Sequence, residues 1–574
     1  KSKEELEDLL IDKIYGEGGV IMCRMPIGID DFRMLREEDY YFVDKTHFIK
    51  SLIDYHAQVT LITRPRRFGK TLMLSMLQEF FDINAAGGNL FDGLKIVQAG
   101  DFYTKKQGKY PVIFISLKDM GVGNFKKTMC MLRAMLSDLY KQFSFLLEAD
   151  VLSEDEKGYF EKIRQADEYM VAEFAMSLSR LSEYLCRYYG VKPIVLIDEY
   201  DAPVQYAWEH GFYDEMIVCM RPFYSKLLKS NKNLEFAVLT GVLRVTKESI
   251  FSGLNNLHVC SVLENDYGDV FGFTPDEVQG IAAQLDREDK LPELKEWYDG
   301  YLFGGKEIYN PWSVIKYFQN DCKLGAYWVN TSENGIIKYL LQDLDGGSRA
   351  ELQHLLEGGS VAKPLQEGVV YTDIGRNRDD LYTMLLTTGY LKVMGEEIDM
   401  FGRVVEMAIP NKEIYTLFAR EVMQYMNGYR GTSELRNMLQ AMLTGNAEVF
   451  EAELSRLLRN LVSYHDTANG ESFYHGLMLG MCVLLRDRYI VKSNWESGYG
   501  RFDLALVPRN KNVCGVLLEF KKADNKADLP AKAEAAAEQI ESREYAVMFS
   551  EQDIDKVWKY GVAFCGKHVC LRRY

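Results

Sequence analysis

VTLITRPRRFGKTLMLSMLQEFF, residues 59–81, predicts a strand, a short loop and a helix in direct succession. The run QVTLIT at 58–63 is apolar and rich in β-branched residues, which is typical of a buried parallel strand. The run TLMLSMLQEFF at 71–81 carries an apolar stripe with helical spacing. A buried strand that leads through a short loop into a helix indicates an α/β fold with a parallel sheet.

The junction between this strand and helix has the chemistry of an anion site. Free N–H groups and the helix dipole favour negative charge at a helix N-terminus, where Gly69, Lys70 and Thr71 lie. Lysine can reach the β- and γ-phosphates there, and the threonine hydroxyl can bind Mg²⁺. The pattern G-x-x-x-x-G-K-[ST] would place its first glycine at the position of Arg64. On this segment alone, a helix N-terminus with a chance Gly-Lys-Thr is the alternative.

An acidic strand end supports the nucleotide interpretation. KPIVLIDEYDAP at 192–203 is a strongly apolar strand followed by acids, and a predicted helix at 171–190 precedes it and ends at a C-cap glycine. Asp198 can hold the water shell of Mg²⁺, and Glu199 can orient and deprotonate the attacking water. The alternative is a strand that simply ends in polar residues.

Further strands complete the predicted sheet. NLEFAVLTGVLRVT at 233–246 predicts a buried strand that ends at Thr240, which is placed to sense the γ-phosphate. Arg244 follows and can reach the phosphate or a neighbouring subunit; a surface arginine is the alternative. YPVIFISLKD at 110–119 supplies another strand. Together these segments predict a three-layer P-loop ATPase core.

The first half of the chain resembles a known family. YYFVDKTHFIKSLI (40–53), LITRPRRFGKTLMLSML, VLIDEYDAPV, LTGVLRVTKESIFSGLNNL and WYDGYLFGGKEIYNPWSVIKYF look like the predicted AAA-ATPase-like family of bacterial proteins, which resembles the STAND-related archaeal ATPases. The resemblance implies ATP binding and makes Arg64 the usual residue of that loop. It assigns the phosphate-loop roles to Lys70 and Thr71, and the acidic-strand roles to Asp198 and Glu199.

The loop differs chemically from one that begins with glycine. Its first turn forms without glycine's conformational freedom, and Pro65 has no N–H to offer a phosphate. Arg66 and Arg67 add positive charge near the phosphates or pair with acids of a lid. We therefore expect ATP binding with slow or conditional hydrolysis. The expected ATP-binding residues are Arg64, Arg66, Arg67, Phe68, Gly69, Lys70, Thr71, Leu72, Asp198, Thr240 and Arg244, with Thr71 and Asp198 as metal ligands.

The middle of the chain predicts mostly helices. In FTPDEVQGIAAQL, residues 273–285, Thr274 and Glu277 form a capping box. The aromatic segment 297–318 is interpreted either as a lid beside the adenine or as a packed aromatic core. DDLYTMLLTTGYLKVMG at 379–395 predicts a helix that breaks at Gly389 into a strand, which suits a small winged-helix element.

The C-terminal part contains a second candidate site. RFDLALV at 501–507 and VLLEFKKA at 516–523 predict paired strands joined by turn residues. Side chains two residues apart share one face of a strand, so Glu519 and Lys521 point the same way, and pairing can bring Asp503 beside Glu519. Two carboxylates that hold Mg²⁺, with a lysine that positions water, suit metal-assisted phosphodiester hydrolysis. An amphipathic hairpin with solvated charges is the alternative.

This part also resembles a known superfamily. ESFYHGLMLGMC, WESGYGRFDLALV, GVLLEFKKA and AAAEQIESREYA are similar to the PD-(D/E)XK nuclease-like domain that accompanies the ATPase family. The resemblance implies metal binding by Asp503 and Glu519, catalysis by Lys521, and support from Gln539. Its third acid would be Glu471 or Glu496. His475 receives no role, and the basic tail KHVCLRRY either touches DNA or offsets local acidic charge.

Composition limits the function classes. The 574 residues carry a formal net charge of −16, which argues against a surface that binds nucleic acid throughout but allows a basic patch. Ten scattered cysteines without zinc-ligand spacing indicate reduced thiols in a cytoplasmic protein. No apolar run approaches the roughly 18 residues that span a bilayer.

The expected cofactors are ATP and Mg²⁺, with Mn²⁺ as an option at the second site. The expected partners are ATP, DNA and a further protein or subunit, without a membrane.

These observations predict six regions along the chain. They are an N-terminal helix at 1–20, the AAA-like core at 21–272, a helical lid region at 273–365, a winged-helix-like element at 366–410, a helical connector at 411–465 and a PD-(D/E)XK nuclease-like α/β domain at 466–574. The leading hypothesis is an ATPase coupled to a metal-dependent nuclease, in defence or mobile-element biology. The alternatives are a STAND-like ATP-dependent switch whose C-terminal domain binds without cleaving, and a nucleotide-binding protein with neither site turning over.

Overall fold

The computed structural model divides the chain into two compact units. Unit 1 comprises Lys1–Ser332 and Ala362–Glu413, and unit 2 comprises Glu333–Val361 and Ile414–Tyr574. The helix expected at 1–20 lies outside the described residues. The structure describes residues 24–85, 88–166, 171–243, 250–251, 255–328, 351–352, 354–356, 358–365, 378–400, 402–426, 433–461, 474–475, 478, 481–482, 485, 488–497 and 500–574.

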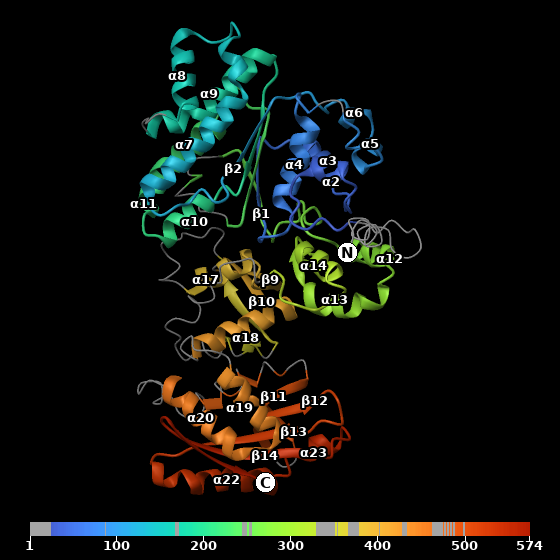
Figure 1. The fold of residues 1–574 in the computed structure, drawn as a ribbon, viewed down its shortest axis with the longest axis vertical. Coiled ribbons are helices and arrows are strands. Elements are labelled where there is room, and N and C mark those ends of the chain that lie inside the picture. The colour runs from blue at the N-terminus through green and yellow to red at the C-terminus, as the bar shows by residue number, and fades with distance from the viewer. Residues whose placement is uncertain are drawn as a thin grey trace, which may run out of the picture. The chain divides into compact units, whose positions relative to one another are not determined.

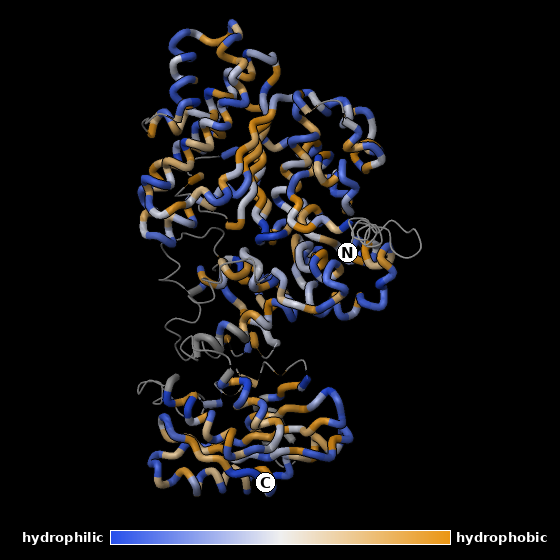
Figure 2. Tube along the Cα trace, viewed as in Figure 1, coloured by the Kyte–Doolittle hydropathy of each residue, from blue (hydrophilic) through white to orange (hydrophobic). Residues whose placement is uncertain are grey.

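Unit 1 is built on a five-stranded parallel sheet with the order β2-β3-β4-β1-β5. The strands β1, β3 and β4 are buried along their whole length, and their hydrophobic character is visible in Figure 2. This confirms the expected buried parallel strands. Their bounds are β1 (Val59–Thr63), β2 (Val112–Ser116), β3 (Ile194–Asp198), β4 (Ala237–Gly241) and β5 (Leu257–Cys260).

Helices cover both faces of this sheet, which confirms the three-layer core (Figure 1). The helix expected at 171–190 ends at Tyr189 and is followed by Gly190 with a φ of 67°, as predicted for a C-cap glycine. The bounds are α2 (Phe32–Glu37), α3 (His47–Tyr55), α4 (Lys70–Phe81), α5 (Lys95–Gln98), α6 (Asp101–Thr104), α7 (Phe125–Gln142), η1 (Ser144–Leu147), α8 (Glu154–Arg164), α9 (Val171–Tyr189), α10 (Ala202–Glu209) and α11 (Tyr213–Leu228).

A small helical segment follows the sheet. Its first helix begins with the predicted capping box, in which Thr274 and Glu277 each bond the other's backbone. Much of the aromatic segment 297–318 is a packed core, since Tyr298, Tyr309 and Tyr317 are buried in one cluster. The elements are α12 (Pro275–Gln284), η2 (Glu288–Lys290), α13 (Leu291–Tyr298), β6 (Tyr301–Phe303), β7 (Lys306–Ile308) and α14 (Pro311–Gln319).

The next segment follows the predicted order of helix, break and strand. Helix α17 (Arg378–Thr387) ends before Gly389, whose φ is 90°, and strand β9 (Lys392–Asp399) then pairs antiparallel with β10 (Gly402–Ala408). The short strand β8 (Ser360–Pro364) and helix α18 (Lys412–Met426) lie where the sequence ranges of the two units meet. A helix followed by a β-hairpin suits the expected winged-helix element.

Unit 2 contains a five-stranded mixed sheet with the order β11-β12-β13-β14-β15. The pair β13 and β14 is parallel, and the other neighbours are antiparallel. Helices α19 and α20 share a buried cluster with this sheet, so part of the expected connector belongs to its core. The elements are α19 (Ser433–Thr444), α20 (Ala447–Leu461), β11 (Tyr489–Ser497), β12 (Gly500–Pro508), β13 (Gly515–Lys522), η7 (Lys526–Asp528), α22 (Leu529–Ser542), α23 (Val547–Ser550), β14 (Val557–Cys565) and β15 (His568–Arg573).

Helix α22 lies close against β14. A Cβ at Gly561 would come within 2.2 Å of the carbonyl oxygen of Ala533 and 2.4 Å of the amide nitrogen of Ala537, so only glycine fits there. This close contact fixes the helix that carries Gln539 against the sheet that carries Glu519. Within the described residues, no helix combines the length and apolar character that crossing a membrane requires.

Candidate functional site

The phosphate-type loop closes around its own lysine. The Lys70 ammonium donates hydrogen bonds of 2.9 Å to the carbonyl oxygens of both Arg64 and Pro65. Gly69 has a φ of 84°, and Arg67 has a φ of 68°. The turn therefore uses a left-handed arginine as well as a glycine, and α4 begins directly at Lys70. Lys70 is thus held beside the backbone that would face a phosphate.

Three predicted residues meet at the ends of the strands. The Thr71 hydroxyl donates to Asp198 Oδ2 at 2.8 Å, and the Thr240 hydroxyl donates to Asp198 Oδ1 at 2.6 Å. Asp198 is fully buried between them. Strand β4 lies between β1 and β3 in the sheet, and this order brings the three side chains together. A hydroxyl and a carboxylate are the oxygen donors that Mg²⁺ prefers, so the residues fit a magnesium–nucleotide complex.

Other acids surround the lysine. Burial lowers the pKa of Lys70, while Glu199, Asp198 and Asp201 oppose that change. Burial also raises the pKa of Glu199, whose backbone is left-handed with a φ of 51°. A raised pKa makes a carboxylate a stronger base than an ordinary glutamate, which favours general-base action on water. The raised pKa is therefore compatible with the role predicted for Glu199.

Asp201 is a part of this site that the sequence did not single out. Its carboxylate accepts hydrogen bonds from the backbone N–H groups of Val242 (3.0 Å) and Leu243 (2.8 Å). It thereby ties the end of β3 to the end of β4, although burial raises its pKa. The one sequence feature that could have indicated Asp201 is its position as the third acid in the run IDEYD. Its partners lie about 40 residues away, at 242 and 243, and no local pattern reveals them.

The structure gives Arg64 a different role from the one expected. Its guanidinium is fully buried and donates to the carbonyl oxygens of Thr63 (2.9 Å), Cys260 (2.8 Å), Asp266 (3.3 Å) and Tyr267 (3.4 Å). Burial lowers its pKa to about 10. The side chain is committed to backbone carbonyls, so the guanidinium is not available for the predicted contact with a phosphate. Arg64 holds the segment after β5 against the loop.

Arg64→Lys is expected to destabilise unit 1 by about 2 kcal/mol, because one ammonium cannot satisfy the buried carbonyls that a five-donor guanidinium reaches. Thermal melting should show a lower midpoint for this variant. Arg66→Lys is the matched control, since the Arg66 side chain makes one long hydrogen bond of 3.5 Å to Gln205. Equal melting of Arg64→Lys and wild type would contradict the structural role.

The remaining loop residues contact the helical segment. The Arg67 guanidinium lies 4.4 Å from the centre of the Trp312 ring, and Phe68 packs edge-on against Tyr301. The Trp328 indole N–H donates to the carbonyl oxygen of Arg66 at 2.9 Å. Leu72 is half-buried in the first turn of α4. The aromatic segment therefore serves as a core and also clamps the loop. The predicted Arg244 lies outside the described residues.

Glu413 extends this clamp to the start of α18. Its carboxylate accepts hydrogen bonds from the Ser313 hydroxyl (2.7 Å) and from the backbone N–H of Trp328 (2.6 Å). Trp328 is the residue whose indole bonds the loop. Glu413 is the second residue of α18 and the last residue of the range Ala362–Glu413 that belongs to unit 1. Sequence reasoning did not identify Glu413, because its partners lie 85 and 100 residues away.

Glu413→Gln is expected to change how stability depends on pH. Burial raises the pKa of Glu413 to about 7 from 4.5, so ionising it in the folded state costs about 3 kcal/mol. Wild-type stability should therefore fall as pH rises from about 4.5 to 7, and the glutamine variant should lack this decrease. Urea unfolding at pH 5 and pH 8 measures it, with exposed Glu397→Gln as control. Parallel profiles for Glu413→Gln and wild type would contradict this expectation.

The second candidate site has the predicted convergence. Strands β12 and β13 pair with Leu504 opposite Leu518, which puts Asp503 and Glu519 at neighbouring positions just beyond that pair. Asp503 Oδ2 accepts a 2.7 Å hydrogen bond from the backbone N–H of Phe520, and Lys521 Nζ lies 3.6 Å from Glu519 Oε1. The Glu519 side chain is 4% exposed and that of Lys521 is 30% exposed. A buried carboxylate beside a more accessible lysine is unlike a solvated hairpin face.

Helix α22 supplies a supporting residue, as predicted. The Gln539 amide donates to Glu519 Oε1 and also lies 3.2 Å from the Tyr545 hydroxyl. Tyr545 was not predicted, since nothing in the run REYA marks it as a site residue. His475, for which the sequence predicts no role, has Nε2 at 2.9 Å from the Asp503 carbonyl oxygen. Glu471 lies outside the described residues, and the side chain of Glu496 is not described.

The donor set of this site fits a hard divalent cation. Asp503 and Glu519 offer carboxylate oxygens, which suit Mg²⁺ and Mn²⁺.

Two arginines of the basic tail make contacts within the fold. Arg572 forms a 3.3 Å ion pair with Glu534, and Arg573 lies over the Trp558 ring. These contacts favour the interpretation that the tail offsets local acidic charge.

The two units define the class of the protein. Unit 1 has a nucleotide-type loop over the ends of a parallel sheet, and unit 2 has a carboxylate–lysine constellation on a mixed sheet. Comparison with protein families agrees: residues 26–251 match the family described as predicted AAA-ATPase, and residues 469–573 match the PD-(D/E)XK nuclease superfamily. The chain thus joins an AAA-ATPase-like segment to a PD-(D/E)XK nuclease-like segment.

A relative resembles the chain over most of its length. A protein of Azotobacter chroococcum mcd 1, described as an uncharacterized protein in the vnfD 5′ region, is 27% identical over 543 residues. The match covers 91% of this chain and 93% of the relative. The two proteins are therefore similar across both units.

Proposed function

We propose that this protein is an ATP-regulated, metal-dependent nuclease that acts on DNA. The convergence of Asp503, Glu519 and Lys521, with Gln539 bonded to Glu519, carries this proposal. A purely structural role does not explain why a carboxylate is buried beside a lysine at this position of the sheet. Pairing of an ATPase-like segment with a nuclease-like segment supports a role in defence against foreign DNA or in mobile-element biology.

The proposed chemistry divides among few side chains. A divalent cation bound by Asp503 and Glu519 would stabilise the charge that develops on the scissile phosphate. Lys521 holds the attacking water by hydrogen bonding and lowers its pKa through its positive charge. Gln539 keeps the Glu519 carboxylate in one orientation. The backbone N–H of Phe520 does the same for Asp503.

ATP binding is proposed at the loop of unit 1. Lys70 would exchange its bonds with the loop carbonyls for bonds to the β- and γ-phosphates, and Thr71 with Asp198 would hold Mg²⁺. Glu199 would orient water for hydrolysis, and Thr240 would report the γ-phosphate through Asp198. A movement of the loop would act on Trp328 and through it on Glu413, the second residue of α18. That connection is the observation that supports a regulatory use of ATP.

The test is a cleavage assay with the purified full chain. We expect cleavage of linear and circular DNA to require Mg²⁺ or Mn²⁺, to stop with a chelator, and to change in rate when ATP is added. RNA of the same sequence distinguishes the substrate class. If the chain binds ATP but cleaves nothing under these conditions, an ATP-dependent switch whose C-terminal domain only binds nucleic acid or a partner becomes the better account.

A further inference from the structure

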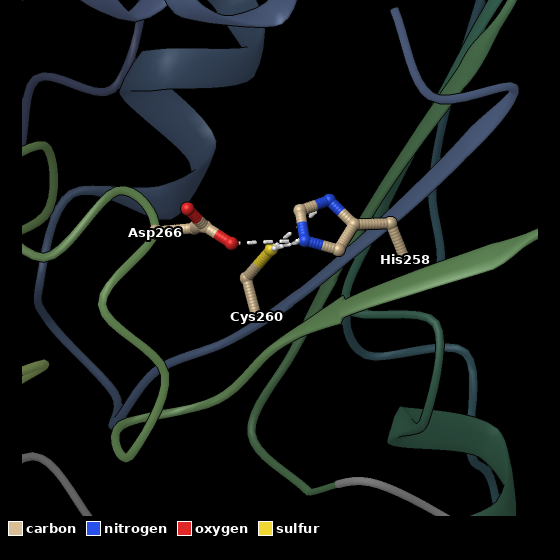
Figure 3. Close-up of side chains that lie close together, drawn as sticks. All are labelled: His258, Cys260 and Asp266. Atoms are coloured by element: carbon tan, nitrogen blue, oxygen red, sulfur yellow. Dashed lines mark hydrogen bonds and ion pairs between the residues drawn. The ribbon is translucent and has the colours of Figure 1, made fainter. Parts of the chain in front are cut away.

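A second type of metal-binding chemistry occurs at the edge of the parallel sheet. His258 and Cys260 are two residues apart on β5, so their side chains lie on one face of the strand. Asp266 comes from the segment that follows β5, and all three side chains point toward one another (Figure 3). Among the described residues, this is the one group of three His, Cys, Asp or Glu residues whose ligand atoms lie within 4.8 Å of one another.

The three ligand atoms lie close enough together to be drawn onto one ion. His258 Nε2 lies 3.1 Å from Asp266 Oδ2 and 3.6 Å from Cys260 Sγ. Ligands bonded to zinc at about 2.0–2.3 Å are about 3.3–3.6 Å apart when the geometry is tetrahedral. Imidazole nitrogen, thiolate sulfur and carboxylate oxygen are all ligands of Zn²⁺, and the thiolate disfavours Mg²⁺ and Ca²⁺.

We propose that His258, Cys260 and Asp266 bind a transition-metal ion of the Zn²⁺ class, with the fourth position open to water. The Asp266 side chain is 46% exposed, which gives the ion access, while Cys260 is fully buried. The Tyr55 ring stacks on the His258 ring at 4.0 Å and 6°, which fixes the orientation of the imidazole. Such support for a ligand ring is usual in metal sites.

Arg64 organises the backbone of two of these ligands. Its guanidinium donates to the carbonyl oxygens of Cys260 and Asp266, at 2.8 Å and 3.3 Å. A thiolate and a carboxylate would neutralise the ion, so the buried guanidinium would face no net positive charge. The carbonyl oxygen of Arg64 also accepts from Lys70, so a bound ion would stabilise a segment in direct contact with the phosphate-type loop. This inference is independent of the nuclease proposal.

A cysteine nucleophile is the competing interpretation of the same three residues. In a triad the thiol and the acid contact opposite ring nitrogens. Here Cys260 Sγ is nearly equidistant from the two nitrogens of His258, at 3.7 and 3.6 Å, and Asp266 occupies Nε2. The thiol is also fully buried and out of reach of a substrate. The lack of substrate access argues against a nucleophile, and the three donor types favour a metal ion.

Co²⁺ titration of the full chain tests the site, because a thiolate ligand gives a sulfur-to-cobalt charge-transfer band that carboxylates of the nuclease-like site cannot give. We expect wild type to show this band at one equivalent of Co²⁺, and Zn²⁺ to remove it by displacement. Cys260→Ser should lose the band, and the matched control Cys186→Ser, a partly buried cysteine on α9, should keep it.

Asp266→Asn tests the site even if the Cys260→Ser variant does not fold, because Asp266 is half-exposed and its substitution should leave the fold intact. It should keep the wild-type melting temperature without metal and bind Zn²⁺ on the order of 100-fold more weakly, as measured by competition with a chromophoric chelator. The proposal fails if wild type shows no band at excess Co²⁺, if the band survives Cys260→Ser, or if Asp266→Asn binds Zn²⁺ as wild type does. In those cases the group is only a hydrogen-bonded His–Asp pair beside a buried thiol.

Discussion

Lys521→Ala is expected to reduce DNA cleavage on the order of 10³-fold, with DNA binding largely unchanged. In the proposed mechanism Lys521, which lies 3.6 Å from Glu519, holds the attacking water and stabilises charge that exists only in the transition state, and such a group contributes several kcal/mol. Asp503→Asn should have an effect of similar size, because it removes one of the two proposed cation ligands. Single-turnover cleavage of labelled DNA in Mg²⁺ or Mn²⁺ measures both variants.

The chain offers matched controls for this experiment. Lys522 is the next residue on β13 and is exposed, and its side chain alternates to the other face of the strand. Lys522→Ala should therefore cleave DNA at nearly the wild-type rate. Asp524→Asn serves the same purpose for Asp503, since Asp524 is exposed. Cleavage that is lost equally in Lys522→Ala and Lys521→Ala would point to DNA binding and against a catalytic lysine.

Lys70→Ala is expected to weaken ATP binding on the order of 10³-fold. A buried ammonium that exchanges loop carbonyls for phosphate oxygens makes charge-assisted hydrogen bonds worth about 1.5–3 kcal/mol each. Thr71→Ala should instead bind ATP with a reduced dependence on Mg²⁺, because the hydroxyl beside Asp198 is lost. Isothermal titration with ATP and a non-hydrolysable analogue, with and without Mg²⁺, measures both effects.

Lys118 is exposed and lies two residues after the end of β2. It serves as the control for removing a positive charge near the carboxyl ends of the parallel strands. Lys118→Ala should bind ATP as wild type does. Wild-type affinity in Lys70→Ala would overturn the assignment of the loop. A melting temperature close to that of wild type is needed in each variant, since Lys70 also bonds the loop backbone.

The sequence predicted β1 to β4 of the parallel sheet and β12 and β13 of the mixed sheet because their signals are local, whereas β5, β11, β14 and β15 were not predicted. The apolar run 58–63, the helical stripe of 71–81 and the capping box at Thr274 depend on neighbours a few residues away. Strand alternation likewise placed Glu519 and Lys521 on one face, and pairing then brought Asp503 near them. In each case the periodicity of the backbone determines the outcome.

The parts that the sequence could not predict depend on partners far along the chain. Arg64 has the charge expected of a phosphate ligand, but carbonyl groups 196 to 203 residues away take its donors. Asp201 and Glu413 were likewise missed, since their importance follows from burial and from backbone N–H groups on other elements. The cluster of His258, Cys260 and Asp266 lacks zinc-type spacing in sequence and forms only when the loop after β5 folds back.

The most direct test of the account is the rate of DNA cleavage as a function of ATP concentration in wild type and in Lys70→Ala. We predict that the wild-type rate changes with ATP and saturates at the concentration that fills the nucleotide site. The Lys70→Ala rate should remain constant over the same range while its cleavage without ATP equals that of wild type. Identical responses in the two proteins, or no metal-dependent cleavage in either, would contradict the proposal that nucleotide binding in unit 1 controls a nuclease in unit 2.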